Sequence, residues 1–227
     1  MVISSLTGSF EHQLNAHRRI AEYVKESSGR CIFLSTANVF DGSPDASHTE
    51  LDIPYPISQY GKYKYACEQL LQSYLGDQLL IVRLPRTLSS KSALKGLQQV
   101  ENGQPVYANL YMSYNATGYV TKAVQFCIEA HKCGIAHLTS VDGMFDHEYT
   151  KLLLSHYHKN LPYTIDSFTV ESYCNALGCD DPALIRCSND GNFYLSLKSV
   201  DSDLLAKFSL SCENVIASLQ PYDSVNK

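Results

Sequence analysis

The sequence contains no tryptophan and no hydrophobic segment of membrane-spanning length. Apolar runs such as residues 32–34 and 79–82 are far shorter than the roughly 20 residues that a transmembrane helix needs. Basic residues form no stripe, and the net charge is −5, from 18 Lys and Arg against 23 Asp and Glu, which makes nucleic acid a poor partner. The first residues show no basic segment followed by an apolar one, so we expect no signal peptide. These absences favour a cytoplasmic protein with neither a membrane nor a nucleic-acid partner.

Patterns typical of a metal site or a disulfide framework are also missing. No C-x-x-C pair occurs, and several cysteines lie within apolar runs, where cysteine packs as a small hydrophobe. The histidines are scattered, and His156 and His158 cannot both point to one side of a helix. We therefore predict no metal site, and free, buried thiols in a reducing compartment. The eight cysteines are Cys31, Cys67, Cys127, Cys133, Cys174, Cys179, Cys187 and Cys212.

What is present is an ordinary globular composition over 227 residues, 44% hydrophobic and 18% charged, enough for one core with a small second lobe. The apolar runs that begin at Cys31 and Leu79 predict buried strands at 31–35 and 79–84. Amphipathic patterns predict helices at 11–26 and 58–75. Strands that alternate with helices at this spacing predict a parallel sheet flanked by helices.

Beyond Pro85 the pattern is looser. We predict helices at 92–102, 117–131 and 146–158, a short strand at 135–139, and a last helix near 211–219. From Leu161 onward the sequence is mainly polar and rich in turn residues. At the other end, the first six residues are typical of the end of a buried strand, although no strand–helix unit precedes them.

Tyr60 and Lys64 carry the clearest chemical signal. They are four residues apart in a predicted helix, so both side chains project from one face. An adjacent ammonium lowers the pKa of a phenol and makes it a usable acid or base. Thr36 ends the preceding strand, 24 residues before Tyr60, at the sheet edge where parallel α/β proteins bind ligands. An isolated Tyr–Lys pair is commonly just a solvated pair, so the strand-end hydroxyl gives the pattern its weight.

Three segments carry a resemblance to a known family: STANVFDG at 35–42, ELDIPYP at 50–56, and YGKYK at 60–64 followed by Glu68. They closely resemble the dTDP-4-dehydrorhamnose reductases, which are extended short-chain dehydrogenases. They are also similar to a non-catalytic relative, the regulatory beta subunit of methionine adenosyltransferase. The resemblance implies an α/β fold: a partial Rossmann-like parallel sheet flanked by helices (residues 1–88), with a small C-terminal α/β substrate-binding lobe (residues 89–227) interleaved with the last strands.

The resemblance also implies roles for particular residues. The catalytic group would be Thr36, Tyr60 and Lys64. The residues that contact NAD(P)H would be Ser4, Ser5, Leu6, Tyr60, Lys64 and Pro85. The residues near a nucleotide-sugar substrate would be Ala37, Asn38 and Asn115. Asn15, in the helix before the first buried strand, would support Lys64 through water, although an exposed helix asparagine is an equally good explanation.

The departures from the family pattern are informative. The family's S-T-D-Y becomes STAN, so an acid and an aromatic residue are lost at Ala37 and Asn38. The glycine-rich turn that cradles the cofactor pyrophosphate is absent, and the only early glycine is Gly8. We therefore expect weak or no NAD(P)H binding. We also expect an unpaired sheet edge at residues 1–5 and uncovered apolar helix faces, which predict either poor solubility or a partner protein or second copy that covers the gap.

Three interpretations remain open. The chain is an NAD(P)H-dependent reductase of a sugar-nucleotide 4-ketone, impaired by the missing turn. Alternatively, it is a non-catalytic regulatory or binding protein on the same fold, or a truncated fragment of such an enzyme. The sequence does not choose the sugar, or NADH over NADPH, because the residue that selects the cofactor follows a strand that the sequence lacks.

Overall fold

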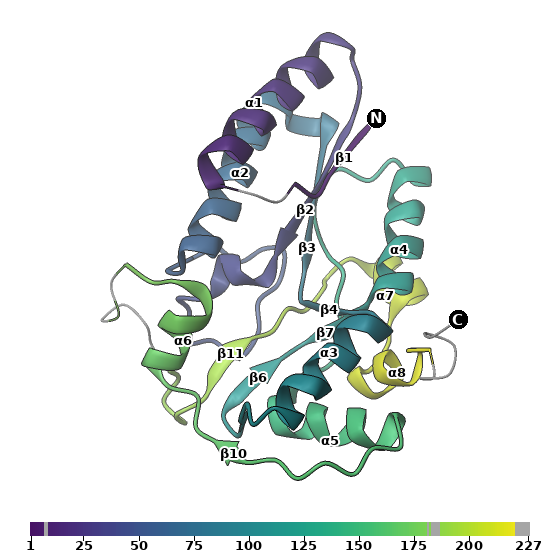
Figure 1. Cartoon of the computed structure of the whole chain (residues 1–227). Coiled ribbons are helices and arrows are strands. Elements are labelled where there is room, and N and C mark those ends of the chain that lie inside the picture. Colours follow the sequence, from purple (N-terminus) through teal and green to yellow (C-terminus); the bar gives the residue numbers. More distant parts are fainter. Residues whose placement is uncertain (7–8, 181, 183–186, 221–227) are drawn as a thin grey trace.

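The computed structural model describes residues 1–6, 9–180, 182 and 187–220. Its central element is a four-stranded sheet in the order β1-β2-β3-β8, with every pairing parallel (Figure 1). The strands are β1 (Val2–Ser4), β2 (Cys31–Thr36), β3 (Leu79–Leu84) and β8 (Gly134–His137). The two strands predicted from their apolar runs, β2 and β3, are adjacent, parallel and buried, which confirms this part of the prediction.

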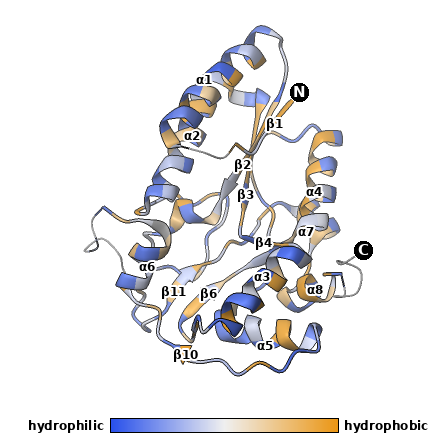
Figure 2. Cartoon of the chain, in the orientation of Figure 1, coloured by the Kyte–Doolittle hydropathy of each residue, from blue (hydrophilic) through white to orange (hydrophobic). Residues whose placement is uncertain are grey.

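Helices cover both faces of the sheet. On one face lie α1 (Phe10–Glu26) and α2 (Gln59–Leu75), and on the other lie α4 (Thr117–Glu129) and α7 (Ser202–Phe208) (Figure 1). Because strand side chains alternate, each strand serves both layers: Phe33 packs towards α2, and its neighbour Ile32 packs towards α4. Figure 2 shows hydrophobic residues concentrated on these strands and on α4.

A second lobe lies beyond the ends of β2 and β3 (Figure 1). Its helices are α3 (Ser90–Glu101), α5 (Asp146–His156), α6 (Val170–Leu177) and α8 (Cys212–Ala217). Its short strands are β4 (Arg86–Leu88), β5 (Val106–Tyr107), β6 (Leu110–Met112), β7 (Tyr114–Ala116), β9 (Met144–Phe145), β10 (Ile165–Asp166) and β11 (Phe193–Leu195). A separate core fills this lobe, around Leu97, Tyr114 and Leu153. The predicted α/β class, with a smaller C-terminal lobe, is confirmed.

The segment after Leu161 is more regular than predicted, because it contains α6 and α7. The Thr169 side chain caps α6 by accepting a hydrogen bond from the Ser172 amide (3.1 Å), and Gly178 ends the helix at a φ of +70°. Thr169 and Gly178 could have been recognised in the sequence as the two ends of a helix. The helix between them spans only eight residues, too few for its periodicity to stand out.

The β1 edge of the sheet is unpaired within the described chain, because β1 pairs only with β2. Met1 and Ile3 are 65% and 48% exposed, and Leu6 is exposed beside them. On the α1 side, by contrast, Ser4 is buried. The expected open edge is therefore present in the described residues, and the exposed apolar side chains at it belong to β1 and its flanks.

All eight cysteines are free. Cys31, Cys67, Cys127 and Cys212 are buried, as predicted, because they lie within the helix and strand cores. The prediction is wrong for Cys133 and Cys187, which are exposed in connections outside helices and strands. Within the described ranges, no helix has both the length and the apolar character required to cross a bilayer.

Candidate functional site

The end of β2 is held in place by a buried ion pair. Arg83 of β3 donates from Nε and Nη2 to the Glu68 carboxylate of α2, at 3.1 and 2.8 Å, and both side chains are almost wholly buried. The Ser35 hydroxyl donates to the same carboxylate. A helix and two strands are thereby tied together next to Thr36. Glu68, which belongs to the family pattern, therefore has a structural role here.

A second group of contacts sets the distance between the end of β2 and α2. After Thr36 the chain makes the short turn η1 (Ala37–Phe40), and Asp41 then accepts hydrogen bonds from the Ile57 and Ser58 amides. Ser58 caps α2 by accepting from the Gly61 amide at 2.9 Å. At Gly61 a Cβ atom would lie only 2.3 Å from the Asn38 carbonyl oxygen. The turn can approach the helix this closely only because residue 61 is glycine.

Gly61→Ala is therefore expected to destabilise the protein by about 1–3 kcal/mol, since the added methyl group forces the turn away from α2. Urea unfolding measures the change. Gly118→Ala in α4 is the matched control, because a Cβ there meets nothing within 4 Å and alanine is the better helix former. A Gly61→Ala protein as stable as the control would contradict this account of the contact between η1 and α2.

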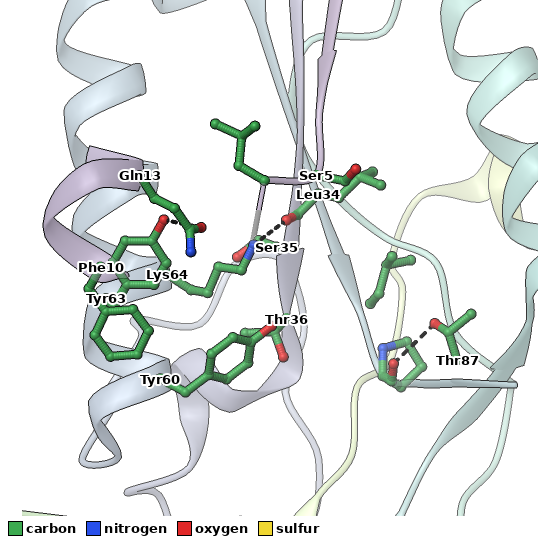
Figure 3. Close-up of a pocket in the computed structure, with 13 residues that line it drawn as sticks. Ser5, Phe10, Gln13, Leu34, Ser35, Thr36, Tyr60, Tyr63, Lys64 and Thr87 are labelled. Atoms are coloured by element: carbon green, nitrogen blue, oxygen red, sulfur yellow. Dashed lines mark hydrogen bonds between the residues drawn. The ribbon is translucent and has the colours of Figure 1, made fainter. Parts of the chain in front are cut away.

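A cavity of about 480 Å³ opens where β2 and β3 end (Figure 3). Thr36, Tyr60 and Lys64 all line it, from the strand end and from two successive turns of α2. Thr87 lies across the cavity from Tyr60 (Figure 3), and Pro85 also lines it. The structure thus brings together the three residues that the sequence pairs as a catalytic group.

The pKa of Tyr60 differs from the sequence prediction. Burial raises it, and a side-chain hydrogen bond with Thr36 opposes the rise only in part. Lys64 is not among the groups that shift it. Its ammonium donates to the Leu34 carbonyl at 2.9 Å (Figure 3), and burial lowers its own pKa. The prediction of a phenol pKa lowered by Lys64 is therefore wrong. Tyr60 is a protonated acid at neutral pH.

The residues predicted at the cofactor side divide into two groups. Ser5, Leu6 and Pro85 line the cavity together with Tyr60 and Lys64. Ser4 does not, because its side chain points towards α1, where its hydroxyl lies 2.9 Å from His17 Nε2 and is buried.

Asn15 is exposed, and Gln13 lines the cavity in its place. The inward face of α1 runs through Gln13, His17, Ala21 and Val24, and a residue two positions along from Gln13 points away from it. Tyr63 donates to Gln13 Oε1 at 2.6 Å, and its ring stacks on Phe10 at 4.4 Å. The helical stripe through Ala21 and Val24 was the signal that could have identified Gln13.

The three predicted substrate residues lie outside this cavity. Ala37 is buried among Val39, Phe40 and Leu197. Asn38 faces Thr36, whose hydroxyl donates to Asn38 Oδ1 at 3.0 Å. Asn115 is buried in the second lobe, where its side-chain amide donates to the Leu138 carbonyl at 2.9 Å and its side-chain oxygen accepts from the Ala116 backbone amide.

A second cavity, of about 340 Å³, lies on the other side of β4. Thr87 lines the first cavity, while its neighbour Arg86 lines the second. The Arg86 guanidinium lies over the Tyr149 ring at 5.0 Å and 3.4 Å from Asp146, and its side chain is 42% exposed. Most of the remaining wall is apolar and comes from α3, α5 and β6. This cavity combines an apolar body with the Arg86–Asp146 ion pair.

Comparison with known proteins places the fold and the cleft in one family. The model of the RmlD substrate binding domain matches residues 9–160, more than half of the chain. The chain belongs to the RmlD substrate binding domain family. The matched span includes β2, the Tyr60–Lys64 helix, Pro85 and Thr87, but not Ser5 and Leu6.

Individual reductases are similar to this RmlD-family chain in sequence or in structure. A dTDP-4-keto-6-deoxy-D-glucose reductase of Streptomyces niveus is 38% identical over 66 residues, which cover 29% of this chain and 23% of that protein. The dTDP-4-dehydrorhamnose reductase structure from Yersinia enterocolitica has a TM-score of 0.71 at 18% identity, covering 89% of this chain and 69% of that one. The Bacillus anthracis reductase in complex with NADP gives 0.69 at 19%, with coverage of 88% and 68%. At these identities the two structures establish the fold alone.

The RmlD-family cleft fits only part of a nicotinamide dinucleotide. Ser5, Leu6, Tyr60, Lys64 and Pro85 form a polar and apolar wall large enough for a nicotinamide and its ribose. Lys64 is the one cation among the residues that line it, and the sequence has no glycine-rich turn to offer backbone amides to a pyrophosphate. The nicotinamide end has a matching surface, and the phosphates have none in the described part of the chain.

Proposed function

We propose that this chain carries the proton-transfer half of an NAD(P)H-dependent reductase of sugar-nucleotide ketones. The observation that supports this most strongly is the convergence of Thr36, Tyr60 and Lys64 on one cavity at the end of β2. A hydroxyl, a half-buried phenol and an ammonium beside one strand end are the groups that a carbonyl reduction needs from its protein.

Tyr60 is the acid in this proposal. Because burial raises its pKa, the phenol keeps its proton at neutral pH and can give it to a carbonyl oxygen as negative charge develops there. Thr36, beside it, orients that oxygen, and Lys64 supplies the positive charge of the site. NAD(P)H supplies the hydride when bound.

The cofactor contacts come from Ser5, Leu6, Pro85 and Lys64, on the nicotinamide side alone. Fixing a large flexible ligand costs several kcal/mol or more, so we propose that binding is weak. The NADP in the related Bacillus anthracis structure supports the cofactor class, and the choice between NADH and NADPH stays open.

The proposed substrate is a nucleotide sugar. The names of the related reductases point to a dTDP-linked 4-keto sugar. We place the sugar in the cavity that Thr36, Tyr60 and Lys64 line.

Turnover tests the proposal directly. The chain is incubated with millimolar NADPH deuterated at the transferred position and with a dTDP-4-keto-6-deoxy sugar, and the product is analysed by mass spectrometry. We expect slow formation of a sugar that carries one deuterium. Product without deuterium, or no product at millimolar cofactor, would contradict a reductase role.

A second candidate function is a non-catalytic binding protein on the same fold. The engagement of Lys64 by the Leu34 carbonyl favours it, since that ammonium then holds the strand end rather than the phenol. The open β1 edge, with Met1, Ile3 and Leu6 exposed, would suit a protein partner or a second copy. In either case the eight free cysteines favour a reducing compartment such as the cytoplasm.

A further inference from the structure

Asn38 occupies a position from which it controls the Thr36 hydroxyl. Thr36 Oγ1 accepts a hydrogen bond from the Asn38 backbone amide at 3.3 Å and donates its own proton to Asn38 Oδ1 at 3.0 Å. Both of these bonds are made to one residue. A hydroxyl has a single proton, so Asn38 Oδ1 competes for it with the other neighbours of Thr36.

One of those neighbours is Tyr60, whose phenol oxygen points towards Thr36 in the cavity that both residues line (Figure 3). A phenolate at Tyr60 is stabilised by hydrogen-bond donors, so the Thr36 hydroxyl stabilises it less while Asn38 competes for the same proton. The backbone keeps this geometry fixed, because the Asn38 carbonyl is wedged against Gly61 of α2 and accepts from the Asp41 amide at 3.3 Å.

We propose that Asn38 is a positioning residue, which holds the Thr36 proton away from Tyr60 and so sets how readily Tyr60 releases its own proton. The inference rests on the proposed function only in giving Tyr60 the role of acid. It assigns to Asn38 a task different from substrate contact. It also gives a physical consequence to the replacement of an aromatic residue of the family by asparagine at this position.

Other groups near Tyr60 are left unchanged by the test. Tyr63 and Lys64 lie on the same helix, and the buried Asp41 is occupied by Ser58 and two backbone amides. Substitution of Asn38 alters none of these residues. An effect on Tyr60 would therefore pass through the Thr36 hydroxyl or come from Asn38 itself.

The experiment places difluorotyrosine at position 60 and follows its titration by fluorine NMR, since fluorination brings the titration into the range where proteins stay folded. Asn38→Ala frees the Thr36 proton to stabilise the phenolate, so the ionisation constant should rise by about three- to tenfold. Asn38→Asp holds the proton more firmly and adds a negative charge, so the constant should fall by at least as much. Asn102→Asp, an exposed substitution at the end of α3, should leave it unchanged.

A purely structural role for Asn38 predicts shifts in the same direction for both substitutions, or none, and either result would overturn the proposal. Repeating Asn38→Ala in a Thr36→Val protein distinguishes an effect through the Thr36 hydroxyl from a direct effect of Asn38. Without the hydroxyl, the substitution should not change the ionisation constant of residue 60. A shift that persists there would also overturn it. None of these measurements needs turnover. Suppose that the ionisation constant rises in Asn38→Ala and falls in Asn38→Asp, but the chain reduces no sugar ketone. That result would refute the reductase proposal and leave the role of Asn38 standing.

Discussion

Tyr60→Phe is expected to lower the rate of sugar-ketone reduction by about 10²- to 10⁴-fold, the usual contribution of a positioned general acid. The substitution removes one oxygen atom and leaves the ring in the cavity wall, so the fold and the cavity volume should persist. The rate is measured at saturating sugar and millimolar NADPH, and circular dichroism verifies the fold.

Tyr63→Phe is the matched control. Tyr63 lies on the same helix and lines the same cavity, but its hydroxyl donates to Gln13, not to the position where a carbonyl would bind. Its loss should change the rate far less. The pH profile gives a second check: because the raised pKa of Tyr60 keeps it protonated, the rate should be level through neutral pH and fall only under alkaline conditions. Equal losses for the two substitutions would contradict the assignment of Tyr60 as the acid.

Glu68→Gln is expected to destabilise the protein by about 3–5 kcal/mol, because it leaves the Arg83 guanidinium buried without a counter-charge. That is a large fraction of the roughly 5–15 kcal/mol of a typical domain. Ser35 bonds to the same carboxylate, so the strand end that carries Thr36 should loosen as well. Urea unfolding measures the stability.

Two further proteins make this test specific. In Glu68→Leu/Arg83→Met both charges are removed, and we expect it to be more stable than Glu68→Gln, since no buried charge remains uncompensated. Lys62→Met breaks only the exposed pair with Asp180 and should leave the unfolding midpoint nearly unchanged. A Glu68→Gln protein as stable as Lys62→Met would show that the buried pair contributes little.

Spacing allowed the main features of the site to be predicted from the sequence. An i, i+4 pair fixes a common helix face, and the end of an apolar run fixes a strand terminus, so Thr36, Tyr60 and Lys64 could be placed together before any coordinates. Ser5, Leu6 and Pro85 were predicted from the family resemblance, and they line the same cavity because the parallel strands that precede them end at one edge of the sheet.

The remaining features depend on packing that a sequence does not display. Which residues of α1 face the cavity depends on the rotation of the helix, so Gln13 was missed and Asn15 was chosen. The pKa of Tyr60 depends on burial, which outweighed any effect of Lys64. Asn115 was assigned from a loose match to a family pattern, and the structure uses both ends of its side chain in backbone hydrogen bonds.

We propose above all that this cleft holds the nicotinamide end of a cofactor, and that the described residues lining it offer little to the phosphates. Titration calorimetry with NADPH and with reduced nicotinamide mononucleotide tests it most directly. We predict that both bind weakly, with dissociation constants of about 0.1–10 mM that differ by less than about tenfold, because the adenylate half makes no contacts that stabilise the complex. Lys64→Gln should weaken both equally. A low-micromolar constant for NADPH, with much weaker binding of the mononucleotide, would contradict the claim and show that another part of the chain recognises the phosphates.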